Sequence, residues 1–231
     1  MSINENITDS LQYPIKDWKK IITLGIILII PIVNFIGLGY YSRIIKSTLT
    51  GLDEVPDFEG IEELFVDGIK IFIICIIYSI IPLIFYAFSV IFARSETVTS
   101  ATTTSSIFSS YLPGLTGIPL VFLMLAVILT LIISIFAYIG LANMIYHDNE
   151  IGAALRYSEI LDIIATIGWR NYILWWIVLT LIIIFAGFII SIVGGILLYF
   201  ILGILVLLLG YSYLIIFQAR SIALIIAFRR G

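Results

Sequence analysis

The sequence predicts an all-α fold, a polytopic membrane helical bundle with about six membrane helices in three hairpins. Composition is the first reason, because 61% of the 231 residues are hydrophobic and 12% are charged, about half the charged fraction of a soluble domain. Charge segregation is the second. The apolar runs are also continuous and do not alternate at a period of two, which excludes an outer-membrane barrel. Stretches without Asp, Glu, Lys or Arg, each holding at least one run near the ~20 residues of a membrane helix, are 21–42, 71–93, 97–147 and 171–219.

Four membrane helices are predicted after the first of these stretches. Between the last two lies "SIVGG" (191–195), which is short enough for a tight turn. Small residues four positions apart, such as Gly187, Ser191 and Gly195, equally suit close helix packing. The helical pattern of the last run continues to Phe228. The four predicted helices are Ile69–Phe92, Ile118–Tyr146, Asn171–Ile190 and Gly195–Phe217.

Two further segments are amphipathic and predict helices that lie in the membrane interface. In "DFEGIEELFVDGIK" (57–70), one helical face is apolar and acidic residues occupy the others. In "NEIGAALRYSEILDIIATIGWR" (149–170), apolar residues oppose Arg156, Glu159 and Asp162. The apolar faces comprise Phe58, Ile61, Phe65 and Ile69 in the first segment, and Ile151, Ala154, Leu155 and Leu161 in the second.

The opening apolar stretch, residues 21–48, is interrupted by Pro31 and Asn34, so it is either one kinked span or a hairpin. Lys and Arg favour the cytoplasmic side of a membrane. A hairpin places 11 of the 12 Lys and Arg on that side and leaves Arg94 outside, whereas a single span gives 8 against 4. The count favours the hairpin. A leg of 16 residues is about 24 Å long, short of the ~30 Å hydrocarbon core, which predicts a short or re-entrant hairpin.

This assignment predicts a multi-pass protein of the cell membrane with both termini cytoplasmic and the loop 94–117 outside. A weak internal repeat accompanies it, because Gly68 and Lys70 match Gly168 and Arg170 at a constant offset of 100 residues. Each proposed unit is an interfacial helix followed by a hairpin. Within a single domain spanning 1–231, the predicted units are 8–50, 56–147 and 148–228.

Residues that could carry chemistry are few. His147 is the one histidine, and with Asp148 and Glu150 it could be imagined as a metal site, but metal sites draw ligands from more than one such cluster. Asp148 or Asn149 is better explained as a helix cap. We therefore predict no catalytic residues, no metal and no cofactor. Basic residues are scattered singly, which gives nucleic-acid binding no support.

A transport path is the remaining possibility. Asn34 sits at the helix break, and broken helices near mid-depth mark substrate sites in some transporters. Together with Ser79, Thr130 and Ser134 it could line a polar path, although the same residues serve equally well as interhelical hydrogen bonds. The residues predicted to bind a ligand are Asn34, Arg43, Asn143 and His147.

Two blocks of sequence resemble a known family. "GLGYYSRIIKSTLTGLDEVPDFEGIEELFVDGIKIF" (37–72) and "LANMIYHDNEIGAALRYSEIL" (141–161) are similar to an archaeal membrane family described as domain of unknown function 4013. The resemblance covers most of the chain except 95–117. It implies a relation to the membrane domain of some glycerophosphodiester phosphodiesterases, and hence a six-helix bundle without its own active site. Matching positions are Gly39, Tyr40, Arg43, Pro56, Phe58, Glu63, Leu64, Phe65, Val66, Asp67, Gly68 and Lys70 in the first block, and Ala142, Asn143, Gly152 and Ala154 in the second.

The function that these observations favour is a non-enzymatic membrane module that organises lipid or a partner. Its expected partners are membrane lipids and either a protein partner or further copies of itself. The alternative is a transporter or channel for a small or lipid-like solute. A membrane enzyme that uses His147 is the weakest of the three hypotheses.

Overall fold

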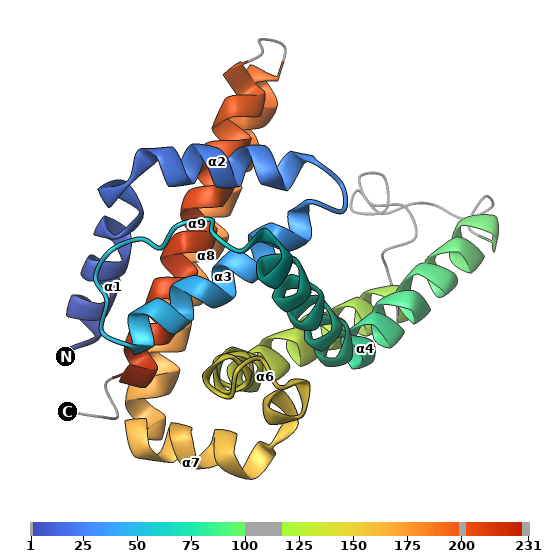
Figure 1. Cartoon of the computed structure of the whole chain (residues 1–231). Coiled ribbons are helices and arrows are strands. Elements are labelled where there is room, and N and C mark those ends of the chain that lie inside the picture. The colour runs from blue at the N-terminus through green and yellow to red at the C-terminus, as the bar shows by residue number, and fades with distance from the viewer. Residues whose placement is uncertain (1, 100–116, 199–201, 228–231) are drawn as a thin grey trace. The chain divides into compact units, whose positions relative to one another are not determined.

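The computed structural model describes residues 2–99, 117–198 and 202–227, and every regular element in these ranges is helical (Figure 1). The predicted outside loop, 94–117, falls largely on residues 100–116, which lie outside the described ranges. The elements are α1 (Ile3–Gln12), η1 (Pro14–Lys16), α2 (Trp18–Ile29), α3 (Asn34–Leu49), α4 (Ile61–Thr99), α6 (Ile118–Tyr146), η3 (Ile151–Leu155), α7 (Tyr157–Ile167), α8 (Trp169–Leu197) and α9 (Leu202–Ala227).

Four of the described helices are long and apolar enough to cross a membrane: α4 as far as Arg94, α6, α8 and α9. The predicted class of membrane helical bundle is therefore confirmed, and α6 has the predicted bounds. The predicted count of about six membrane helices is not confirmed. The remaining two candidates, α2 and α3, have 12 and 16 residues, or about 18 and 24 Å of helix.

The chain divides into two compact units, and α4 and α6 each run from one into the other. The larger unit comprises Met1–Ile74 and Tyr138–Gly231, and the smaller one Cys75–Ala137. In the smaller unit, Phe122 of α6 contacts three phenylalanines of α4, with the ring of Phe92 stacked on it at 5.5 Å. The division into units 8–50, 56–147 and 148–228 stays a prediction.

Helix α9 is the centre of the larger unit and packs against α1, α2, α3 and α8 (Figure 1). The crossing with α2 is close because Gly25 has no side chain: a Cβ there would lie 3.3 Å from both Leu208 and Ser212. On the α8 side, a Cβ at Gly194 would overlap Leu207. Small residues therefore bring neighbouring helices close to α9.

Residues 30–33 separate α2 from α3, so the opening stretch forms two helices that pack against each other and not one continuous span. The amide of Asn34 donates to the carbonyl of Ile30 at 3.1 Å. Ile32 has φ +73°, a left-handed conformation that is rare for a β-branched residue. Pro31 accounts for the break, because it lacks the N–H that would continue the helix.

The N-terminal part of α4 crosses α3 so closely that the backbones of the two helices are in contact. A Cβ on Gly39 would overlap the carbonyl of Leu64, and a Cβ on Gly68 would overlap the carbonyl of Phe35. The Phe35 ring lies edge-on to Phe65 at 5.9 Å beside this crossing. Gly39 and Gly68 both belong to the block 37–72 that carries the family resemblance. The close contact between α3 and α4 explains why glycine occupies these two positions.

Three predictions about local structure are corrected. Residues 57–70 do not form a separate interfacial helix, because α4 begins at Ile61 and runs without interruption into its apolar part. The predicted "SIVGG" turn lies inside α8. A Cβ at Gly187 or Gly195 would meet no atom of another helix within 4 Å, so these glycines do not make the close packing that their spacing indicated.

The second amphipathic segment does form its own helix, α7, with a different buried face from the predicted one. Leu161 is 42% exposed. Ile151 and Leu155 are half-buried and belong to η3, and Ala154 in η3 is buried as predicted. The buried side chains of α7 are Ile160, Ile163, Ile164 and Ile167.

Candidate functional site

The structure brings together two of the four residues predicted to bind a ligand. Asn143 and His147 line one pocket in the larger unit. Arg43 lines a separate, open surface site with Asp57 and Glu63. Asn34 is exposed at the start of α3 and belongs to neither group.

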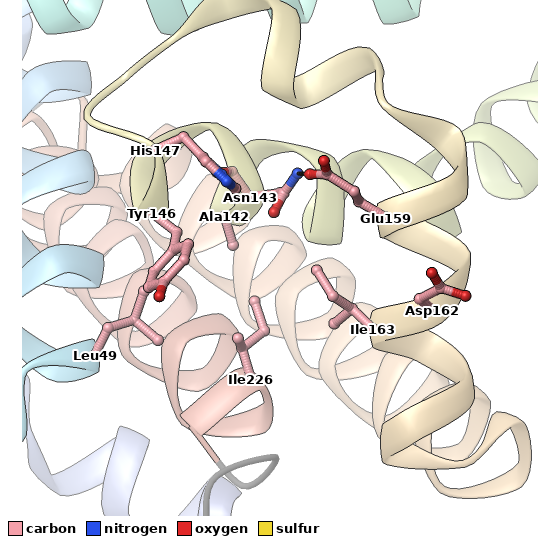
Figure 2. A pocket seen from close by; sticks show the side chains of 9 residues that line it. All are labelled: Leu49, Ala142, Asn143, Tyr146, His147, Glu159, Asp162, Ile163 and Ile226. Atoms are coloured by element: carbon pink, nitrogen blue, oxygen red, sulfur yellow. Dashed lines mark hydrogen bonds between the residues drawn. The ribbon is translucent and has the colours of Figure 1, made fainter.

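The pocket that contains Asn143 and His147 has a volume of about 430 Å³. It lies between the C-terminal end of α6 and α7, with the ends of α3 and α9 on its other side (Figure 2). Polar groups and apolar side chains both contribute to its wall. The lining comprises Asn143, His147, Glu159, Asp162 and Tyr146, and the apolar residues Leu49, Ala142, Ile163 and Ile226.

Asn143 is buried, with 4% of its surface exposed. Its Nδ2 donates to the Ala153 carbonyl at 3.0 Å and to Glu159 Oε2 at 2.9 Å. Both partners are acceptors, so the reverse orientation of the amide would place oxygen against oxygen and is excluded. Oδ1 consequently points away from Glu159 toward the pocket (Figure 2).

His147 is oriented in a similar way. Its Nδ1 lies 2.9 Å from the carbonyl oxygen of Asn143. A carbonyl only accepts, so Nδ1 carries the hydrogen, and in the neutral ring Nε2 is an acceptor. The ring of Tyr146 lies edge-on to the imidazole at 5.3 Å.

Glu159 on α7 is held ionised. Its pKa is lowered first by the hydrogen bond from Asn143 and then by Arg156. Arg156 lies 3.3 Å from Glu159 and 2.9 Å from Glu150, so this guanidinium joins the start of α7 to the turn before η3. Asp162, one turn further along α7, is exposed.

The turn after His147 corrects the predicted capping role of Asp148 and Asn149. Both residues have a positive φ, 52° and 60°, which Asn and Asp tolerate better than other side chains. The N-cap of η3 is Glu150, without a side-chain hydrogen bond. Asp148 instead pairs with Lys46 at 2.7 Å, which lowers its pKa, and Asn149 Oδ1 accepts from Ser42 at 3.0 Å.

A second polar cluster surrounds Arg220, which is 5% exposed. Its Nε donates to Asp9 Oδ1 at 2.8 Å, and its Nη2 donates to Asp53 Oδ1 at 2.7 Å. Nη1 reaches Thr48 Oγ1 at 3.2 Å and the Leu52 carbonyl at 3.1 Å. We refer to Asp9, Thr48, Leu52, Asp53 and Arg220 as the arginine cluster; it joins α1, the end of α3, the following loop and α9.

Tyr13 completes the surroundings of this guanidinium, which lies 4.4 Å from the centre of the tyrosine ring. Burial raises the pKa of Tyr13 to about 12, and its hydroxyl donates to the Glu54 carbonyl at 2.8 Å. Lys16 forms a 2.6 Å ion pair with Asp53. The hydrogen bond from Lys16 is the main cause that lowers the pKa of Asp53.

Arg43, on α3, has a comparable structural role and holds the loop that follows this helix. It donates to the carbonyls of Asp57, at 3.2 Å, and Glu59, and lies 3.6 Å from the Glu63 carboxylate. These contacts fasten residues 57–59 to α3 and to the foot of α4.

Sequence reasoning missed the arginine cluster, although one signal pointed to it. Arg220 is the only charged residue from 171 to 228, and such a charge inside an apolar pattern is retained only with partners. It also missed the network in which Trp175 Nε1 donates to Asn6 Oδ1 at 3.3 Å and to Ser221 Oγ at 3.0 Å. The partners come from opposite ends of the chain, which no local pattern reveals.

At two positions of the predicted polar path, the side-chain hydroxyl forms a hydrogen bond within its own helix. The hydroxyls of Ser79 and Thr130 donate to the carbonyls of Cys75 and Ala126, one turn earlier in the same helix, at 2.7 and 2.8 Å. Among the residues that the structure describes, no group of three or more His, Cys, Asp or Glu side chains is placed to hold a metal ion.

Long apolar helices with a polar layer at their ends define a helical membrane protein. Residues 23–195 match the model of a family described as protein of unknown function (DUF4013), and the chain belongs to this family.

A similar curated protein is the uncharacterized protein MJ1189 of Methanocaldococcus jannaschii, 28% identical over 194 residues. That alignment covers 82% of this chain and 61% of the relative, so the chain spans about three fifths of the relative's length. No solved structure matches the chain. The relation to phosphodiesterase membrane domains stays a prediction.

Proposed function

We propose that the protein is a non-enzymatic module of the cell membrane that organises the lipids around it. The observation that carries this proposal is the α2–α3 hairpin. Its helices are about 18 and 24 Å long, less than the ~30 Å hydrocarbon core. Helices of this length are too short to cross the full hydrocarbon core, so the hairpin displaces lipid mainly on the side from which it enters, while the long helices cross both leaflets.

The distribution of exposed side chains supports this role. Near the turn of the hairpin, Ile26, Ile29 and Ile32 are 55%, 54% and 68% exposed. At the other end of α2, Asp17 caps the helix by accepting from the amides of Lys19 and Lys20. An apolar tip with a charged base is the pattern of a segment that enters the hydrocarbon from one surface.

The base of the hairpin is also held in place. Lys20 at the start of α2 pairs with Asp57 at 3.1 Å, and the arginine cluster fastens the end of α3 to α9. A rigid base keeps the tip at a fixed depth, which is what a lipid-organising element requires.

Under this proposal, both termini and the base of the hairpin lie on the cytoplasmic side of the membrane. After Cys75→Ser, single cysteines at Asn4, Ser47, Ser105 and Ser158 are treated with an impermeant thiol reagent on intact cells. Only the Ser105 site should react from outside; Ser105 lies outside the described residues. Labelling of the Asn4 site from outside would show that the opening stretch crosses the membrane.

Lipid organisation itself is measured with spin-labelled lipid confined to one leaflet of proteoliposomes. More motionally restricted lipid is expected in the leaflet that contains the hairpin, and Ile32→Asn should remove that excess. Asn tolerates the left-handed backbone at this position. Phe185→Asn, on α8, is the matched control because Phe185 is also 68% exposed, and it should not change the difference between leaflets.

Equal restricted lipid in both leaflets would contradict the proposal. The transporter alternative predicts a different result, namely solute flux into proteoliposomes that Asn34→Leu abolishes. If the difference between leaflets is seen only when a second protein is present, we would conclude that the hairpin organises a protein partner and not lipid.

A further inference from the structure

We propose that the pocket between α6 and α7 binds a protonated amine. The ammonium group would sit between Asn143, His147 and Asp162, with its carbon chain against Leu49 and Ile226. This site does not depend on the lipid-organising role proposed above, because it lies in a different part of the larger unit from the tip of the hairpin.

In the polar wall of the pocket, the side-chain donors of Asn143 and His147 are hydrogen-bonded to the protein, whereas an acceptor on each residue is not. Both hydrogens of Asn143 Nδ2 are directed to protein acceptors, and Nδ1 of His147 is directed to a carbonyl. Within the described part of the chain, no side chain or amide donates to Asn143 Oδ1 or to His147 Nε2. A ligand that matches this wall must therefore donate hydrogen bonds.

Burial makes the acceptor on Asn143 informative. The side chain is 96% buried, since 4% of its surface is exposed, and its oxygen points into the pocket (Figure 2). Among the described residues, the fully buried side-chain atoms without a partner are Thr180 Oγ1 and Ser212 Oγ, so Asn143 Oδ1 is accessible from the pocket although the residue as a whole is buried. A ligand with an N–H group can therefore reach this acceptor from the pocket.

Charge selects a cation among the possible donors. Glu159 and Asp162 line the pocket, and none of the described residues that line it is Lys or Arg. Arg156 already pairs with Glu159, so Asp162 is the carboxylate left for a ligand cation. The pKa of Glu159 is lowered, so its carboxylate stays ionised at neutral pH. Hydrogen bonds between an ammonium and such acceptors are charge-assisted and stronger than neutral ones.

Size and the apolar wall favour an organic cation. A cavity of about 430 Å³ falls within the range of small-molecule sites. Leu49, Ile163 and Ile226 offer contacts to carbon. The amine could come from a free small molecule or from a lipid headgroup, and the chemistry of recognition is the same for both.

The test uses the full chain in phosphatidylcholine nanodiscs and calorimetric titration with ethanolamine. Ethylene glycol, in which a hydroxyl replaces the ammonium, is the matched ligand control. Saturable binding of ethanolamine and no binding of ethylene glycol is the expected result. Equal affinity for both compounds, or no saturable binding of ethanolamine in nanodiscs free of amine lipid, would overturn the proposal.

Two variants locate the site. Asp162→Asn should weaken ethanolamine binding by about tenfold, because one carboxylate becomes neutral while the size and shape of the side chain are kept. Glu62→Gln removes the same charge on α4, away from the pocket, and should leave binding unchanged. If both variants weaken binding equally, the effect is one of net charge and the pocket is not the site.

A last comparison distinguishes the two sources of the amine. Nanodiscs that contain phosphatidylethanolamine are compared with nanodiscs that contain its N-acetylated form. If only phosphatidylethanolamine suppresses ethanolamine binding, a lipid headgroup occupies the pocket; if neither does, the site takes free amines. Either result supports an ammonium site, and loss of the leaflet difference described above would leave it unaffected.

Discussion

The arginine cluster and the α6–α7 pocket are both polar sites in the larger unit, and they differ in what remains unused. Arg220 has partners on Nε, Nη1 and Nη2, from three segments of the chain. In the pocket, Asn143 and His147 use their donors on the protein and leave acceptors facing a cavity. The first arrangement is complete without a ligand and holds the fold together. The second leaves acceptors available, and we propose above that an amine binds to them.

The largest expected effect is at Arg220. Arg220→Met should lower the free energy of unfolding by about 3–5 kcal/mol, because removal of one partner strands a buried ionic cluster. Asp53 is largely exposed, and water can replace part of its pairing, which favours the lower end of that range. The measurement is equilibrium unfolding in detergent micelles.

Arg220→Lys is the control for charge, since it keeps the cation but not the planar fork. It should lose less stability than Arg220→Met. A loss below about 1 kcal/mol for Arg220→Met would show that the cluster does not hold the fold together.

Asn143 should have the next largest effect on stability. Asn143→Leu removes one hydrogen bond to the Ala153 carbonyl and one to Glu159, and we expect a loss of about 1–3 kcal/mol. Asn34→Leu is the matched control, because this exposed amide should change stability by no more than about 0.5 kcal/mol. Similar losses for the two variants in the same unfolding assay would contradict the distinction between them.

Acid should weaken the arginine cluster in a defined pH window. The pKa of Asp53 in the folded protein is lowered by Lys16 and Arg220, whereas in the unfolded chain it is about 3.9. The unfolded chain therefore binds the proton more readily, so this contribution is present above about pH 4 and is lost as pH falls through the lower, folded pKa.

Unfolding measured from pH 7 to pH 2 tests this expectation. The wild type should lose stability below about pH 4, and Asp53→Asn should remove part of that dependence. An identical pH profile for the variant would show that other carboxylates account for acid sensitivity.

The smallest expected effect on stability is at Asp162. Asp162→Asn should change the free energy of unfolding by no more than about 0.5 kcal/mol, because the side chain is exposed and lies away from features that produce large effects. The same variant is expected to impair amine binding. A residue that matters for a ligand and not for stability is the clearest contrast with Arg220.

The sequence predicted the membrane class and the bounds of α6, because continuous apolar runs are local features. The "SIVGG" turn was misplaced because glycines in a membrane helix can serve packing as well as turning. The segment 57–70 was misread because the foot of a long helix and a separate interfacial helix have the same amphipathic pattern.

The candidate site was only half predictable for a related reason. Asn143 lies in the last turn of α6 and His147 directly follows that helix, four residues later, so their proximity follows from helical geometry. Glu159 and Asp162 were recognised as a polar face, but their approach to Asn143 depends on the turn at 148–149. The partners of Arg220 lie 167 to 211 residues away, beyond any local signal.

That separation has a consequence for how the protein is made. Asp53 leaves the ribosome 167 residues before Arg220, on the order of 10 to 30 seconds earlier at ordinary rates of synthesis. During this interval α1, the base of the hairpin and the loop that follows α3 have been synthesised without the side chain that will join them. Arg220 is therefore the last member of the arginine cluster to be synthesised, and Asp9, Thr48 and Asp53 lack this partner until then.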